Sequence, residues 1–127
     1  MPATAHWFVQ QELGRVGSHA RQALAQVRRA RTLREVHQTV QVPVPVAVRS
    51  LSHLVHELRD LELAAEQRMR ELVADQLAAV AKLTDFKARE RELGALRAQH
   101  WQYLRADFPL TLAFAEQEAA QLLRPQH

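Results

Sequence analysis

Apolar residues recur at spacings of three and four along most of the chain, a pattern typical of amphipathic α-helices. The first stripe predicts a helix over residues 5–30, and its apolar face consists of Val9, Leu13, Val16, Ala20, Ala23, Leu24, Val27 and Ala30. Arg31 and Arg34 fall where this stripe would continue, and burying an unpaired charge there is unfavourable. We therefore expect the first helix to end near Arg31.

A short helix is predicted next, over residues 33–40, because a new apolar stripe with a different phase begins after Thr32. Thr32 also precedes Glu35 by three residues, which is the spacing of a capping box. In such a box the Thr32 hydroxyl accepts a hydrogen bond from the backbone N–H of Glu35, and the Glu35 carboxylate accepts one from the N–H of Thr32. Residues 41–48 should be an extended linker, since Pro43 and Pro45 each disfavour helical geometry in the residue before them.

The longest uninterrupted pattern covers residues 49–105, which contain no proline and a single glycine, Gly94. Apolar residues recur there at seven-residue steps, as in a coiled coil: Leu51, Leu58, Ala65, Leu72, Ala79, Phe86 and Leu93. We expect one long central helix, with a two-helix hairpin turning at Thr84–Asp85 as the alternative, because these two residues form the one plausible interior cap. Phe108–Pro109 ends this region, and a last helix is predicted over residues 110–123.

These elements predict an all-α fold, an elongated helical bundle with coiled-coil character that forms a single domain over residues 1–127. The stripe of the long helix is about twice as long as the first helix can cover, and exposed apolar surface is unfavourable. We expect a homo-oligomer, with a dimer favoured. The residues predicted for its interface are Leu51, Leu58, Leu72 and Phe86.

Two polar residues, Glu62 and Gln76, interrupt the stripe of the long helix. Polar residues at such positions can set the register and the oligomeric state of a coiled coil. We favour the simpler interpretation that both lie at the edge of the stripe and reach solvent.

Aromatic residues gather at two places, near the N-terminus and near residue 101. Trp7 and Phe8 are expected in the core. Trp101 and Tyr103 lie near the end of the predicted long helix, where aromatic side chains are well suited to contact a partner.

Composition excludes several classes of protein. The chain has no cysteine, so disulfides, thiolate catalysis and zinc–thiolate sites are excluded. The first residues lack a basic segment followed by an apolar one, and no run reaches the roughly 18 apolar residues of a membrane helix. We expect a cytoplasmic protein that does not enter a membrane.

Positive charge is concentrated in the N-terminal third. Residues 1–42 contain six arginines against two glutamates, a net charge of +4, whereas the whole chain carries +3. The arginines Arg28, Arg29, Arg31 and Arg34 lie close together in sequence. Guanidinium groups bind carboxylates and phosphates in a fork geometry, so this cluster suits an acidic protein surface or a nucleic acid.

Catalytic and metal sites are not indicated. His53, His56, Glu57 and Asp60 have the spacing of metal ligands on a helix, but most of them point away from the apolar stripe and fit a solvated face. No glycine-rich phosphate loop occurs, and no hydroxyl has a recognisable base and orienting acid. We expect a non-catalytic protein without a cofactor.

Residues 32–51 resemble the helix-turn-helix of bacterial transcription regulators. The residues at matching places are Thr32, Leu33, Glu35, Val36, Val42 and Arg49. The resemblance implies DNA binding, but Gln41 stands where the turn glycine is usual, and the recognition helix would open with Val44, Val46 and Val48, which cannot read base edges.

The leading hypothesis is therefore an oligomerising helical interaction protein whose arginine-rich third contacts an acidic partner. The alternative is a DNA- or RNA-binding protein that uses the same arginines and is dimerised by the long helix.

Overall fold

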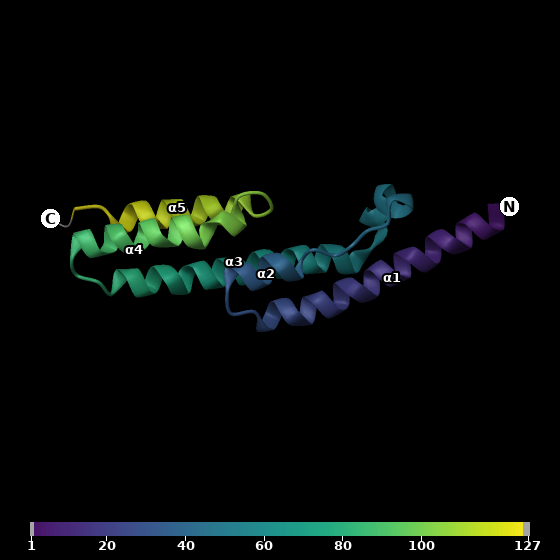
Figure 1. Ribbon diagram of the computed structural model, residues 1–127, viewed down its shortest axis with the longest axis horizontal. Helices are drawn as coiled ribbons and strands as arrows, with labels where there is room; N and C mark the ends of the chain where they lie inside the picture. Colours follow the sequence, from purple (N-terminus) through teal and green to yellow (C-terminus); the bar gives the residue numbers. More distant parts are fainter. Residues whose placement is uncertain (1, 126–127) are drawn as a thin grey trace.

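The computed structural model describes the backbone of residues 2–125, and its side chains from residue 7 onward. This part of the chain is all-α and contains no strand (Figure 1). Its elements are the α-helices α1 (Pro2–Arg29), α2 (Leu33–Thr39), α3 (His56–Ala81), α4 (Phe86–Gln99) and α5 (Pro109–Leu122), and the 3₁₀ helices η1 (Val46–Leu54) and η2 (Trp101–Leu104).

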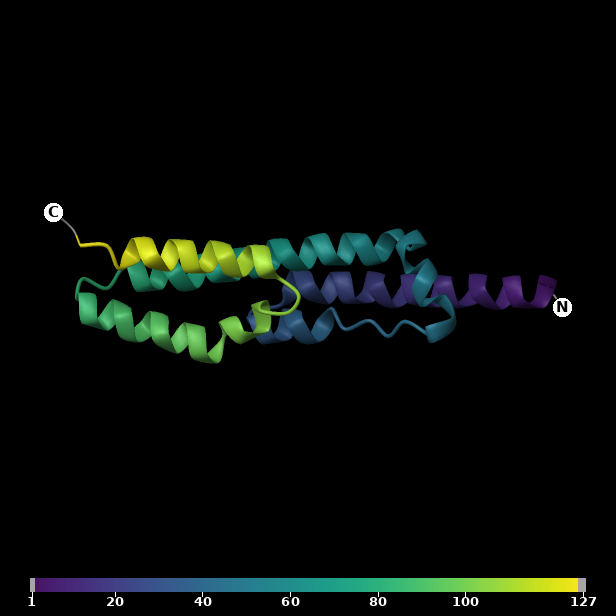
Figure 2. The ribbon, with the colours of Figure 1, turned by 90° about the horizontal axis from the view of Figure 1, so that it is seen from above.

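Helix α3 is the central element of an elongated molecule (Figures 1 and 2). Helix α1 lies along the N-terminal half of α3 and runs in the same direction, while α4 and α5 lie along its C-terminal half. Helix α2 contacts both α3 and η2, so the two halves meet there. The N-terminal end of α1 projects beyond the other helices (Figure 2).

One hydrophobic core runs along both halves. In the N-terminal half, small residues of α1 such as Ala20 and Ala23 are buried together with Leu61 and Ala65 of α3, which allows the two helices to lie close together. In the C-terminal half, Ala115 and Ala119 of α5 belong to the same core cluster. The remaining buried residues of this half include Val73, Leu77, Val80, Leu93, Trp101, Leu104 and Phe108.

The prediction of one helix over residues 49–105 is wrong, and the hairpin alternative is the structure that forms. Residues 49–54 belong to η1, and extended geometry at Val55 separates η1 from α3. Helix α3 ends at Ala81, and α4 begins after Asp85, whose carboxylate accepts a hydrogen bond from the backbone N–H of Lys87 at 3.3 Å. The interior cap therefore reverses the chain, although the heptad pattern continues through it.

The predicted capping box at the start of α2 is confirmed with one difference. Thr32 Oγ1 accepts from the backbone N–H of Glu35 at 3.1 Å. The carboxylate of Glu35 accepts from the N–H of Arg31, at 2.8 Å, instead of from Thr32. Both ends of the box therefore hold the α1–α2 turn in a defined conformation.

The side chains of two arginines donate hydrogen bonds to backbone carbonyls at the ends of neighbouring helices. Arg68 of α3 donates through Nε to the carbonyl of Ala30, just after the end of α1, at 2.8 Å. Arg89 of α4 donates to the carbonyls of Ala81, Leu83 and Leu122, at 2.9, 2.6 and 3.2 Å. Arg89 thus satisfies carbonyls at the ends of both α3 and α5, which have no partner within their helices.

Candidate interaction surfaces

The four clustered arginines lie on the connection between α1 and α2. Arg28 and Arg29 are in the last turn of α1, Arg31 is in the connection, and Arg34 is in the first turn of α2. All four are exposed. We call this group the arginine turn, and its backbone is held by the capping box and by Arg68.

The charge of the arginine turn is not neutralised within the chain. Among the described residues, none of its four guanidinium groups forms an ion pair or a hydrogen bond. Arg68, Arg89 and Arg97, by contrast, all bind carbonyls or carboxylates of neighbouring helices. The two groups therefore differ in their contacts, because the first has no intramolecular partner among the described residues and the second connects helices of the same chain.

Two acidic residues lie near the arginine turn. Glu35 and Glu71 lie beside it, bound to Arg31 N–H and to the guanidinium of Arg68. Helix α3 contains six carboxylates against three arginines, a net charge of −3. The arginine turn is therefore a small, positively charged patch on a surface of mixed charge.

The helix-turn-helix geometry expected from the resemblance is not formed. After α2, residues 41–45 are extended, and the next element is the 3₁₀ helix η1, which is not an α-helix. Val48, which would face DNA in a recognition helix, is fully buried. The two prolines extend the connection, and no helix is presented that fits a major groove.

The residues predicted for an oligomer interface are distributed over three elements. Leu72 is 8% exposed and belongs to the core of its own chain, and Leu58 packs against that core. Leu51 is half-buried in η1, and Phe86, the first residue of α4, is 48% exposed. Helix α1, and helix α5 after the chain turns back at residues 82–85, pack on α3 and so cover part of the stripe that a second copy was expected to cover.

Trp101 and Tyr103 were expected to face a partner, and the structure places Trp101 in the core. Its ring is 1% exposed, and its Nε1–H donates to Oε1 of Gln76 at 3.1 Å. Gln76 is thus half-buried and bonded, and does not simply reach solvent. Tyr103 is half-buried, with its ring centroid 5.4 Å from that of His37 in α2.

Trp7 and Phe8, which were expected in the core, are exposed instead. They lie on the projecting end of α1, with 58% and 48% of their surface exposed. Val46 and Leu54, at the two ends of η1, are also largely exposed. This part of α1 lies beyond the start of α3, so no helix of the same chain covers it (Figure 2).

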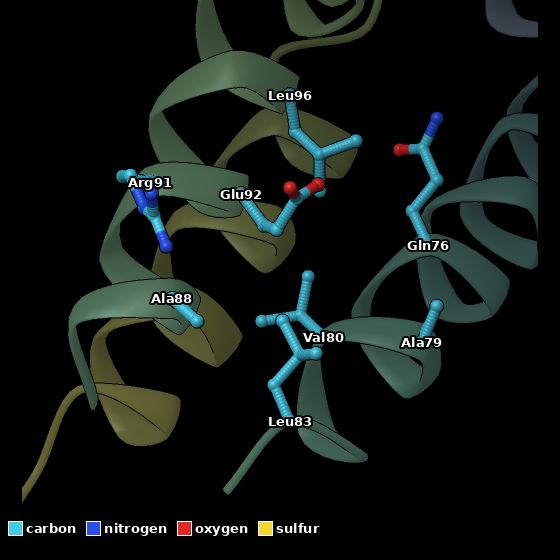
Figure 3. A pocket seen from close by; sticks show the side chains of 8 residues that line it. All are labelled: Gln76, Ala79, Val80, Leu83, Ala88, Arg91, Glu92 and Leu96. Atoms are coloured by element: carbon cyan, nitrogen blue, oxygen red, sulfur yellow. The ribbon is translucent and has the colours of Figure 1, made fainter. Parts of the chain in front are cut away.

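A groove lies between the facing sides of α3 and α4 (Figure 3). Its volume is about 370 Å³, and Val80 of α3 and Leu83 of the α3–α4 connection oppose Ala88 and Leu96 of α4 across it. Polar side chains lie at its border, namely Gln76, Arg91 and Glu92. The lining is mostly apolar and contains no nucleophile with a neighbouring base, so the groove does not indicate catalysis.

The residues with metal-ligand spacing do not form a cluster. Glu57 lies against Gly17 of α1 and is 3.9 Å from the guanidinium of Arg21, while His53 and His56 are exposed. Within the described part of the chain, no group of three or more histidine or acidic side chains is placed to hold a metal ion.

The described helices include none that is long and apolar enough to cross a lipid bilayer. Comparison with protein families, with characterised proteins and with solved structures gives no significant match.

Proposed function

We propose that the protein is a non-catalytic, oligomerising interaction protein that binds an acidic partner through the arginine turn. The observation that carries this proposal is the contrast between four exposed arginines without intramolecular partners and the arginines that hold the helices together. Leaving four like charges adjacent is unfavourable in the isolated chain, and an acidic partner would remove that repulsion.

The position of the turn supports a specific contact. Arginine side chains are flexible, but their backbone is held here by the capping box and by the bond from Arg68 to Ala30. A held backbone reduces the conformational entropy that is lost when a partner binds. Arg28 and Arg29 also lie at the C-terminal end of α1, where the helix dipole favours positive charge.

An acidic protein surface fits this turn better than a nucleic acid. Duplex DNA carries one phosphate charge per about 1.7 Å along its axis, so its binding needs a broad basic surface. The arginine turn is compact and is bordered by the carboxylates of Glu35 and Glu71. Nucleic-acid binding remains the second candidate because guanidinium groups also match phosphates.

Oligomerisation is supported by exposed apolar side chains. Trp7 and Phe8 on the projecting end of α1 and Phe86 at the start of α4 all expose about half of their surface. Aromatic side chains are enriched in protein interfaces. The exposure of these aromatic side chains supports a second copy, whereas most of the heptad positions pack within the same chain.

The proposal is tested by fluorescence anisotropy with a labelled polyglutamate peptide, a mixed-sequence DNA duplex and a single strand, each over a salt series. The test variant replaces the arginine turn with alanine. A matched control replaces four exposed arginines elsewhere and so makes the same change in net charge; these are Arg59, Arg91, Arg105 and Arg124.

Salt-sensitive binding of the peptide that is lost in the test variant and kept in the control would support the acidic-partner function. Tighter binding of the duplex or single strand, with the same dependence on the turn, would favour the nucleic-acid alternative. Equal weakening in both variants would show that only net charge matters, and would overturn the proposal.

A further inference from the structure

A second groove, which we call the acidic groove, lies between the end of α2, the N-terminal half of α3 and the start of α5. Its volume is about 340 Å³. Three carboxylates line it: Glu62 and Glu66 of α3 and Asp107 of the η2–α5 connection. No lysine or arginine lines it.

The chemistry of the acidic groove fits an arginine side chain. The apolar surface of the groove comes mainly from the half-buried Val40, with a small exposed part of Phe108, above the fully buried Ala65. The methylene groups of an arginine pack on such a surface, while its guanidinium binds carboxylates at the rim. A lysine would match this site less well, because its ammonium cannot form the bidentate fork.

The carboxylates of the acidic groove are largely unengaged. Among the described residues, Glu62 and Glu66 form no ion pair, and Asp107 has only a distant contact, at 3.9 Å, with His37 Nδ1. Three like charges around one groove repel one another, and a cationic group would relieve that repulsion.

We infer that the acidic partner of the arginine turn is the acidic groove of a second copy of this chain. The inference rests on the proposed function, because it names the partner of the same turn. Two surfaces of one molecule carry opposite, uncompensated charge: four free guanidinium groups on the turn and three carboxylates around the groove. Complementary charge of this kind favours association and selects the partner.

The two surfaces are separate places on one molecule. The turn is at the N-terminal end of α2 and the groove is at its C-terminal end, about 10 Å away for seven helical residues. Each contact therefore joins two different surfaces, with the turn of one copy in the groove of another. Either two copies exchange both contacts and form a closed dimer, or successive copies form an open chain.

A charge-swap experiment tests the inference. One variant, Arg31→Glu with Arg34→Glu, reduces the charge of the turn from +4 to 0, and Arg34 lies in the first turn of α2, where the helix dipole favours an acidic residue. The other, Glu62→Arg with Glu66→Arg, inverts the groove. Asp107 is left unchanged so that its contact with His37 stays intact.

Self-association is measured by sedimentation velocity, at about 50 mM and about 500 mM salt, where screening differs strongly. Wild type should associate at low salt, with an apparent dissociation constant that rises at least about tenfold at high salt. Each variant alone should sediment as a monomer, and an equimolar mixture of the two should recover a 1:1 complex. Circular dichroism establishes that each variant keeps its helix content.

Two control variants make the same charge changes elsewhere on the exposed surface. Arg91→Glu with Arg124→Glu controls for the turn, and Asp75→Arg with Glu90→Arg controls for the groove. Both should associate like wild type.

Several outcomes would overturn the inference. These are a monomeric wild type at low salt, association that neither swap reduces, or a mixture that fails to recover the complex. A monomeric wild type that still binds polyglutamate through the turn would overturn the inference and the oligomerising part of the proposed function, but would leave the acidic-partner contact intact and assign the turn to a different protein. Association that is insensitive to salt and to both swaps would point to the aromatic end of α1.

Discussion

The indole of Trp101 donates a hydrogen bond to the side-chain carbonyl of Gln76, and the 3.1 Å contact joins η2 to the C-terminal part of α3. Trp101 is almost completely buried, so its N–H has no access to water. The one polar side chain that interrupts the α3 stripe at this level is therefore the partner that makes burial of the indole favourable.

Replacing Gln76 by leucine should lower the free energy of unfolding by about 1–3 kcal/mol, because the buried indole N–H loses its acceptor. Gln76→Glu keeps a hydrogen-bond acceptor at the same place and should lower the free energy of unfolding by a smaller amount. Urea unfolding followed by tryptophan emission gives the measurement, and a Trp7→Phe background removes the signal of the exposed indole. Equal losses for leucine and glutamate would show that the bond contributes little.

The three carbonyls bound by Arg89 lead to a second prediction. Arg89→Met keeps most of the aliphatic chain but removes all three hydrogen bonds, so it should destabilise the protein by about 2 kcal/mol or more. Amide hydrogen exchange should accelerate most in the last turns of α3 and α5. Arg91 lies two residues further along α4 and is exposed, so Arg91→Met is the control that should leave hydrogen exchange unchanged.

Arg97 and Glu116 form a bidentate ion pair between α4 and α5, with 2.8 and 2.9 Å contacts. Both side chains are about 40% exposed, so a double-mutant cycle should give a coupling of only about 0.2–1 kcal/mol. The hydrogen bond to Glu116, with a smaller coulombic contribution, raises the pKa of Arg97 above its usual range despite the opposing effect of burial.

A raised pKa of a cationic group means that its stabilising contribution is complete below the ordinary arginine pKa and is lost only at higher pH. The coupling between Arg97 and Glu116 should therefore be constant from neutral to moderately alkaline pH. A coupling energy that decreases over this pH range would show that the ionisation of a group other than Arg97 determines the strength of the ion pair.

The glycines of α1 should respond differently to alanine. A methyl group at Gly14 meets nothing within 4 Å, so Gly14→Ala should stabilise the protein by about 1 kcal/mol through helix propensity. At Gly17 the new methyl would lie 3.2 Å from Oε2 of Glu57, and the carboxylate must move. Gly17→Ala should therefore stabilise the protein less than Gly14→Ala. Equal increases in the melting temperature would show that the Glu57 carboxylate moves without a loss of stability.

Local signals in the sequence were sufficient for some helix ends, but not for the start of α3 at His56 or the end of α4 at Gln99. The spacing of Thr32 and Glu35 predicted the start of α2, and Thr84–Asp85 marked the place where α3 and α4 separate. These predictions succeed because a cap involves residues within one turn of each other. The choice between one helix and a hairpin stayed open, since the apolar pattern is the same in both.

Contacts between segments that are distant in sequence could not be predicted from such local signals. The heptad at Leu58 and Leu72 shows that these residues need cover, but not whether α1 of the same chain or a second copy provides it. Trp101 and Gln76 are 25 residues apart, and nothing near either of them indicates the other. The acidic groove likewise joins α3 to residues just after α2 and just before α5, so it exists only once the chain is folded.

Helix α3 is shared by both halves of the molecule, and this has a consequence for how the chain can be divided. A cut at residues 82–85 would remove α4 and α5 and leave Val73, Leu77 and Val80 facing water. A cut before His56 would equally remove the cover from Leu61 and Ala65. Neither fragment keeps a complete core, so the two halves should melt together in a single transition.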